Sequence, residues 1–188
     1  LGNVLRDLGK LKEAELSIRK AIELNPDFAE AHCNLGNILR DVGKLKEAEL
    51  SIRKAIELNP NLVEAHTNLG NVLSDLGKLK EAELSIRKAI ELQPDFAEAY
   101  YNLGSILKGL GKLKEAELSI RKAIELNPNF ANAHSNLGNI LSYLGKSKEA
   151  ENVYRKAIEI DPYSANAHSN LSNVLRDLGR LKEAEISY

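Results

Sequence analysis

Four histidines are the side chains of this sequence best suited to metal binding or acid–base chemistry. His32, His66, His134 and His168 take the same place in a pattern that repeats every 34 residues. Zinc needs its ligands within about 2 Å of one ion, whereas equivalent residues of neighbouring repeats are at least ~8–10 Å apart, the spacing of packed helices. Cys33 directly follows His32, so the two point to different faces of a helix. We therefore expect the histidines to fill a packing position, and we expect no metal, no cofactor and no catalytic residue in this segment.

Asparagine is the second recurring polar residue. In the segment 29–62, Asn34 and Asn37 stand between Glu30 and Asp41 at steps of four, three and four, so all four residues share one helix face. An amide both donates and accepts hydrogen bonds and can pair with a peptide backbone without reading its side chains. Asparagine in mid-helix is a mediocre helix former without a capping role, so its recurrence favours binding of an extended peptide. The alternative is that these amides solvate a groove or brace neighbouring helices.

The candidate peptide-binding residues are these asparagines together with one lysine and two tyrosines. The lysine and tyrosines stand where the repeats diverge, although the rest of each repeat is nearly invariant. Tyrosine is also enriched among residues that dominate binding energy. We expect the lysine and tyrosines to select ligand side chains and the asparagines to hold the ligand backbone. The full set is Asn34, Asn37, Asn68, Asn71, Tyr101, Asn102, Lys108, Asn136, Asn139, Tyr143, Asn170 and Asn173.

Two amphipathic helices are expected to position these residues in each repeat. Apolar residues recur at three- and four-residue steps over 31–42 and again over 45–58. Gly43 ends the first helix because glycine adopts the left-handed conformation without steric cost. Pro60 ends the second because proline disfavours helical geometry in the residue before it. The small residue Gly36 lets the two helices approach closely, and strand signals are absent.

The second helix also carries a charged line. Glu49, Arg53 and Glu57 follow one another at four-residue steps, and near-identical copies recur along the chain. Such a line supports a helix modestly and usually faces water. The sequence therefore predicts a solvated convex surface rather than a charged docking face.

Proline recurs every 34 residues, and a fixed period of this length is typical of solenoids. The pattern of small residues, bulky apolar residues and proline within one period resembles the tetratricopeptide repeat. The matching positions are Leu35-Gly36, Ala48, Ile52, Ala55 and Pro60. The resemblance covers the whole chain and implies an all-α, right-handed α-solenoid, a superhelix of 34-residue helix-turn-helix repeats. It predicts a single array over 1–188, with a partial repeat 1–28, full repeats 29–62, 63–96, 97–130 and 131–164, and a partial repeat 165–188.

The resemblance also implies where a ligand binds. In this family the asparagine face lines a concave groove that holds extended peptides. The stretches Ala167 to Leu171 and Tyr154 to Pro162 resemble the tetratricopeptide arm of O-linked N-acetylglucosamine transferases, in which an asparagine ladder holds substrate protein. Family members that clamp chaperone tails have basic groove residues instead, where this sequence has Glu30 and Glu64, so chaperone-tail binding is not expected.

Composition narrows the classes of partner. The formal net charge of −1 gives no basic field for nucleic acid or anionic lipid, and no apolar run is long enough to cross a bilayer. A single cysteine and no signal-peptide pattern favour a cytoplasmic location. Leu1 and Tyr188 both fall inside repeat units, so end-to-end self-association through truncated repeats is expected.

Three functions remain open at this point. The first is a protein-interaction scaffold that binds extended peptides through the asparagine ladder. The second is the substrate-recruiting arm of a larger transferase whose catalytic domain lies elsewhere. The third is a duplicated or engineered array without a dedicated ligand.

Overall fold

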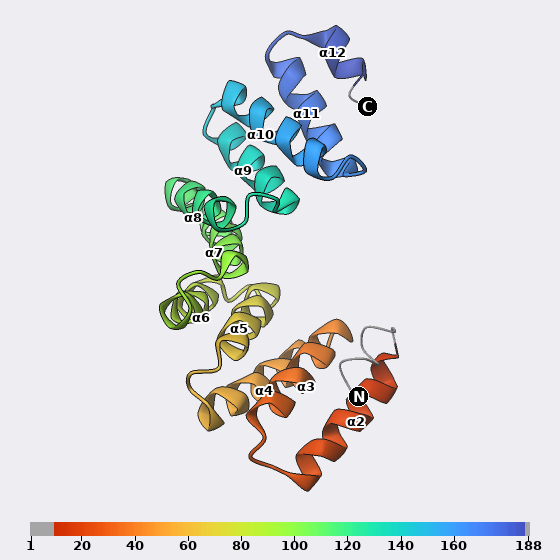
Figure 1. The fold of residues 1–188 in the computed structure, drawn as a ribbon, viewed down its shortest axis with the longest axis vertical. Coiled ribbons are helices and arrows are strands. Elements are labelled where there is room, and N and C mark those ends of the chain that lie inside the picture. The colour runs from red at the N-terminus through yellow and green to blue at the C-terminus, as the bar shows by residue number, and fades with distance from the viewer. Residues whose placement is uncertain (1–9, 187–188) are drawn as a thin grey trace. The chain divides into compact units, whose positions relative to one another are not determined.

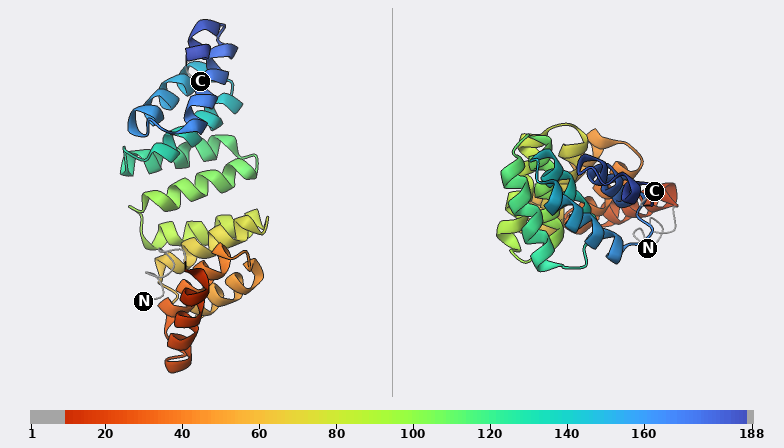
Figure 2. Two further views of the ribbon diagram at one scale, coloured as in Figure 1. Left: turned by 90° about the vertical axis from the view of Figure 1, so that its right-hand side faces the viewer. Right: turned by 90° about the horizontal axis from the view of Figure 1, so that it is seen from above.

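A computed structural model describes residues 10–186, which form helices joined by short turns and contain no strand (Figures 1 and 2). The helices are α2 (Leu11–Leu24), α3 (Ala29–Asp41), α4 (Leu45–Leu58), α5 (Val63–Asp75), α6 (Leu79–Leu92), α7 (Ala97–Gly109), α8 (Leu113–Leu126), α9 (Ala131–Tyr143), α10 (Ser147–Ile160), α11 (Ala165–Asp177) and α12 (Leu181–Ile186).

The helix ends lie where the sequence predicts them. Helix α3 ends at Asp41, and Gly43 follows with a φ of 78°, a left-handed conformation that costs glycine little. The Lys44 N–H then donates to the Leu39 carbonyl at 2.8 Å, which satisfies a carbonyl in the last turn of the helix. Helix α4 ends at Leu58, and the residue before Pro60 is extended.

The two helices of a hairpin meet at their small residues. A Cβ added at Gly36 would lie 2.2 Å from Cγ1 of Ile52 and 3.3 Å from the Ala48 carbonyl oxygen. Ala48, Ile52 and Ala55 are fully buried. The prediction that Gly36 permits a close approach of the helices is therefore confirmed, and Figure 1 shows α3 and α4 side by side.

The chain divides into two compact units between Pro94 and Asp95. The first unit holds α2 to α6 and the second α7 to α12; in the first, α3 packs on both α4 and α5, and in the second, α9 packs on α7, α8, α10 and α11. The single array over 1–188 stays a prediction. The truncated repeats at Leu1 and Tyr188, and self-association through them, lie outside the described residues.

Within residues 10–186, no helix is both long and apolar enough to cross a membrane.

Candidate functional site

The predicted asparagines follow one side of the first helices, which we call the ladder face. In the first unit its members are Asn34 and Asn37 on α3 and Asn68 and Asn71 on α5. In the second unit they are Asn102 on α7, Asn136 and Asn139 on α9, and Asn170 and Asn173 on α11. All are half-buried except Asn136, which is buried, and Asn173, which is exposed.

The first asparagine of a repeat braces the preceding first helix. The Nδ2 of Asn68 donates to Sγ of Cys33 at 3.2 Å, and the Nδ2 of Asn136 donates to Oγ of Ser105 at 2.8 Å. The Nδ2 of Asn170 donates to Oδ1 of Asn139 at 3.0 Å. These three amide donors are thus used inside the protein, as the alternative reading of the pattern allows.

The second asparagine of a repeat behaves differently in the first unit. The half-buried side chains of Asn37 and Asn71 make no hydrogen bond to any residue that the structure describes. Within residues 10–186, the donors and acceptors of these two side chains are therefore unused. In the second unit, Oδ1 of Asn139 accepts from the Tyr154 hydroxyl at 2.7 Å as well as from Asn170.

The remaining asparagines of the second unit differ again. The Nδ2 of Asn102 is buried and has no hydrogen-bond partner among residues 10–186. The Oδ1 of Asn173 accepts a hydrogen bond from Arg176 on its own helix. Among the described asparagines of this unit, Asn102 alone leaves an amide donor buried and unsatisfied, which is a costly arrangement.

Lys108 is the charged residue of the predicted set. Its Nζ donates to Oδ1 of Asn136 at 2.9 Å, so the structure brings these two candidates together. Burial lowers the pKa of the Lys108 ammonium, because burial disfavours the charged form. Asn136 thus uses its donor on Ser105 and its acceptor on Lys108 and holds the lysine in place.

The two predicted tyrosines lie in different surroundings. The Tyr101 ring packs on Phe130 with ring centroids 4.9 Å apart, so part of it serves the fold. Tyr143 is 73% exposed. Tyr143 is therefore much more accessible to a ligand than a core aromatic would be.

The first unit neutralises its own cation at the position equivalent to Lys108. The Nε of Arg40 on α3 lies 2.5 Å from Oδ2 of Asp75 on α5, 35 residues further along the chain. The residue 35 positions after Lys108 is Tyr143. Once the structure gives this separation, the sequence shows that no acid stands at the matching position for Lys108.

The histidines hold the turns between repeats. The Nε2 of His66 lies 2.8 Å from the Pro60 carbonyl oxygen, and the same contact joins His32 to Pro26, His134 to Pro128 and His168 to Pro162. A carbonyl oxygen can only accept, so Nε2 carries the proton in each ring. In the described part of the chain, no group of three or more His, Cys, Asp or Glu residues is placed to hold a metal ion.

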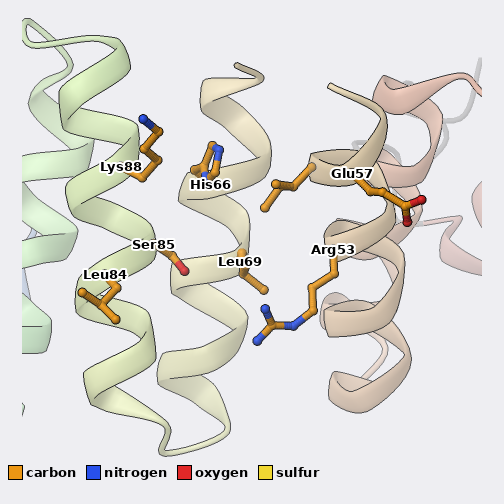
Figure 3. A pocket seen from close by; sticks show the side chains of 8 residues that line it. Arg53, Glu57, His66, Leu69, Leu84, Ser85 and Lys88 are labelled. Carbon is orange, nitrogen blue, oxygen red and sulfur yellow. The ribbon is translucent and has the colours of Figure 1, made fainter. Parts of the chain in front are cut away.

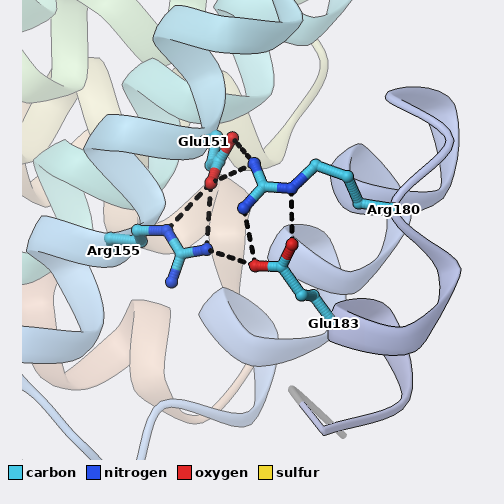
Figure 4. A network of polar contacts seen from close by, with 4 residues as sticks. All are labelled: Glu151, Arg155, Arg180 and Glu183. Carbon is cyan, nitrogen blue, oxygen red and sulfur yellow. Dashed lines mark hydrogen bonds and ion pairs between the residues drawn. The ribbon is translucent and has the colours of Figure 1, made fainter.

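In the charged line of the second helices, Arg53 and Glu57 are exposed as the sequence predicts, but the first glutamate is not. The Glu49 side chain is only 13% exposed and pairs with Arg53 at 2.9 Å and with Lys78 of the next repeat at 2.8 Å. Figure 4 shows a similar cluster in the second unit, where Glu151 binds both Arg155 and Arg180. These carboxylates join successive repeats, because each accepts from two of them.

A pocket of about 450 Å³ lies away from the ladder face in the first unit (Figure 3). Its apolar lining includes Ile56, Leu69 and Leu84, and Arg53 and Lys88 stand beside them. None of the predicted site residues lines it. Both cations already pair with glutamates, Arg53 with Glu49 and Lys88 with Glu91, so the pocket offers no unpaired charge.

Sequence profiles of one family match this chain. The profile described as tetratricopeptide repeat matches residues 29–62, 97–130 and 131–164, which together exceed half of the chain. Two related profiles match residues 2–43 and 70–111, and residues 52–83 and 153–186. No curated protein gives a significant match.

Solved structures of similar fold include those of three proteins. YrrB, described as a TPR protein with an unusual peptide-binding site, has a TM-score of 0.72 at 29% identity over 90% of this chain and 88% of its own. MamA has a TM-score of 0.76 at 27% identity over 88% of this chain and 96% of its own. PilF of Pseudomonas aeruginosa has a TM-score of 0.90 at 21% identity over 100% and 85%, which shows the fold alone. The predicted all-α solenoid of helical hairpins is thereby confirmed.

Proposed function

Because the chain belongs to the tetratricopeptide repeat family, we propose that it is a protein-interaction scaffold whose ladder face binds an extended peptide. Proteins of this repeat family act generally as scaffolds for protein partners. The finer proposal is that asparagine amides hold the backbone of the ligand. YrrB supports it as a relative in fold that is described as having a peptide-binding site.

One observation carries the proposal. Asn37 and Asn71 present half-buried amides that form no hydrogen bond within the described residues. A partly desolvated polar group that lacks a partner gains more from a ligand hydrogen bond than a fully hydrated one does. Each amide offers donors and an acceptor, which match the alternating groups of an extended backbone.

The bracing asparagines have a separate role in this account. Asn68, Asn136 and Asn170 fix the spacing of neighbouring first helices through their Nδ2 groups. A ligand held by several helices needs that spacing to be constant, because misplaced donors lose most of their hydrogen-bond energy. The ladder is thus divided between residues that hold the scaffold and residues that hold the ligand.

A selection from randomised peptides, fused to a carrier, tests the proposal. The wild-type protein should enrich peptides that the double variant Asn37→Ala/Asn71→Ala binds about tenfold or more weakly, which is the loss expected for two or more hydrogen bonds. Asn152→Ala is the matched control, since Asn152 is an exposed asparagine of a second helix. Equal affinity of the double variant and the control, or no enrichment at all, would overturn the proposal.

The resemblance to the O-linked N-acetylglucosamine transferase arm remains a proposal about context. In that reading the same ladder face recruits substrate protein for a catalytic domain on the same polypeptide. Binding experiments do not distinguish a scaffold from a recruiting arm, because both functions require peptide binding on the ladder face. The full-length gene distinguishes them, since only a recruiting arm is encoded together with a catalytic domain. We assign no reaction to residues 1–188.

A further inference from the structure

Lys108 is an unpaired cation on the ladder face of the second unit. An ammonium has three donors, and the described residues supply one acceptor, the Oδ1 of Asn136 at 2.9 Å. Lys108 forms no ion pair with any residue of the described range. Two of its donors therefore remain for solvent or for a ligand.

Within the second unit, the described residues of α7 and α9 place no acid close to Lys108. Helix α9, which carries Asn136, has no aspartate or glutamate over its whole length. The acid on α7 itself is Glu98, ten residues earlier and therefore about 15 Å away along the helix axis. Helix α8 commits Glu117 to Arg121 and Lys146.

The equivalent cation of the first unit shows what is missing. Arg40 is neutralised by Asp75 at 2.5 Å, and the residue that stands in the place of Asp75 for Lys108 is the exposed Tyr143. An acid at position 143 would form an internal ion pair with Lys108, as Asp75 does with Arg40. The tyrosine at this position supplies no carboxylate to the lysine.

The lysine is also held in position rather than free in solvent. Asn136 is 7% exposed, and its amide orientation is set by the hydrogen bond from its Nδ2 to Ser105. This leaves Oδ1 pointing to the ammonium. Half-burial without an anionic partner is unfavourable for a charged group, and it is relieved when an anion binds.

We propose that Lys108 binds the carboxylate of an aspartate or glutamate side chain within an extended peptide on the ladder face of the second unit. The ligand carboxylate accepts from the ammonium while Asn136 keeps the lysine in place. The ladder continues past Lys108 onto α9 and α11 and can hold ligand backbone beyond the lysine, so we assign the carboxylate to an internal side chain; a C-terminal carboxylate is the alternative outcome of the test. This inference rests on the proposed function, peptide binding along the asparagine ladder.

The test compares the residues that wild-type and variant proteins enrich from the same randomised peptides. Lys108→Gln keeps an amide donor for Asn136 but removes the charge. Lys156→Gln is the matched control, because Lys156 is an exposed lysine on α10 that pairs with Glu159. Wild type and the control should enrich an acid at one fixed peptide position, and Lys108→Gln should enrich no acid there.

Synthetic peptides then distinguish an internal side-chain carboxylate from the carboxylate at the peptide C-terminus. Replacing the enriched acid by its amide should weaken binding to wild type about tenfold, the usual loss for a charge-assisted hydrogen bond, and should leave binding to Lys108→Gln unchanged. Amidation of the peptide C-terminus should have no effect on either protein. A Lys108→Glu protein should instead enrich lysine or arginine at the same position.

The possible negative results distinguish a failure of the Lys108 inference from a failure of the proposed peptide binding. Enriched peptides that show no acid preference, or an acid preference that Lys108→Gln retains, overturn this inference and leave the proposed function standing. Sensitivity to C-terminal amidation in place of the internal acid also overturns it. If no peptide is enriched by the wild-type protein, the proposed function fails and this inference fails with it.

Discussion

The Nζ of Lys78 lies 2.8 Å from the carboxylate of Glu49 in the preceding repeat. Arg53 on the same helix as Glu49 approaches the other oxygen of that carboxylate at 2.9 Å, so one acid is shared by two cations. The shared carboxylate joins adjacent hairpins of the first unit on the side formed by the second helices. Stability in repeat proteins depends on such interfaces between neighbours.

Replacing Glu49 should therefore destabilise the protein although the residue belongs to a charged surface line. Glu49→Gln is expected to lower the free energy of unfolding by about 1 kcal/mol, since a partly buried, hydrogen-bonded pair exceeds the median surface salt bridge. Glu57→Gln is the control, because Glu57 is 70% exposed and pairs only within its helix. Urea unfolding at neutral pH should show less than about 0.5 kcal/mol for the control; equal losses for both variants would show that the shared carboxylate has no special role.

The same carboxylate predicts a pH dependence. The hydrogen bond from Lys78, followed by that from Arg53, holds the pKa of Glu49 below its ordinary value. A depressed pKa in the folded state adds stability above the unfolded value of about 4.3, and this stability is lost as the pH falls through the folded pKa. The difference in unfolding free energy between wild type and Glu49→Gln should shrink between pH 6 and strongly acidic pH, and a constant difference would exclude the ion pair as its cause.

Close helix approach predicts a second, larger effect. A Cβ on Gly70 would lie 2.4 Å from Cδ1 and 2.5 Å from Cγ1 of Ile86. Gly70→Ala should cost about 1–3 kcal/mol of unfolding free energy through overpacking, despite the better helix propensity of alanine. In an Ile86→Ala background the same change should cost much less, because the crowding atoms are gone. Additive losses in this double-mutant cycle would contradict the packing explanation.

Tyr154 predicts behaviour at alkaline pH. Burial raises the pKa of the Tyr154 hydroxyl to about 12, compared with about 10 in the unfolded chain. The unfolded state therefore loses this proton first, and Tyr154 contributes a loss of stability as the pH rises from about 10 to about 12. Tyr154→Phe should remove that contribution and, near neutral pH, cost about 1 kcal/mol for the lost hydrogen bond to Asn139. An unchanged alkaline limb in the variant would assign the titration to other groups.

Periodicity predicts the hairpins well because their determinants are local. Gly43 and Pro60 mark the helix ends at Asp41 and Leu58, and Gly36 marks the close approach of the two helices. Each of these residues acts through its own backbone or its immediate neighbours. Such local effects can therefore be predicted from the sequence of a single repeat.

The polar network was harder to predict because its partners lie on other helices. The contact of Asn68 with Cys33 depends on how α5 is rotated against α3, which no single repeat determines. Glu49 looks solvated from its four-residue spacing, yet Lys78 from the next repeat covers it. His66 was expected only to fill space, whereas its Nε2 donates to the Pro60 carbonyl, a group that the sequence pattern does not display.

The most direct test of peptide binding on the ladder face is to observe the asparagine side chains themselves. A peptide enriched by the wild-type protein is titrated into ¹⁵N-labelled protein, and the side-chain NH₂ signals of Asn37 and Asn71 are followed by NMR, with single Asn→Ala variants to assign them. If the ladder face binds the peptide, both signals should show saturable shifts, while the backbone signals of Leu84 and Lys88 at the pocket should not move. Shifts confined to Leu84 and Lys88, with Asn37 and Asn71 unchanged, would contradict it and place the ligand on the second helices.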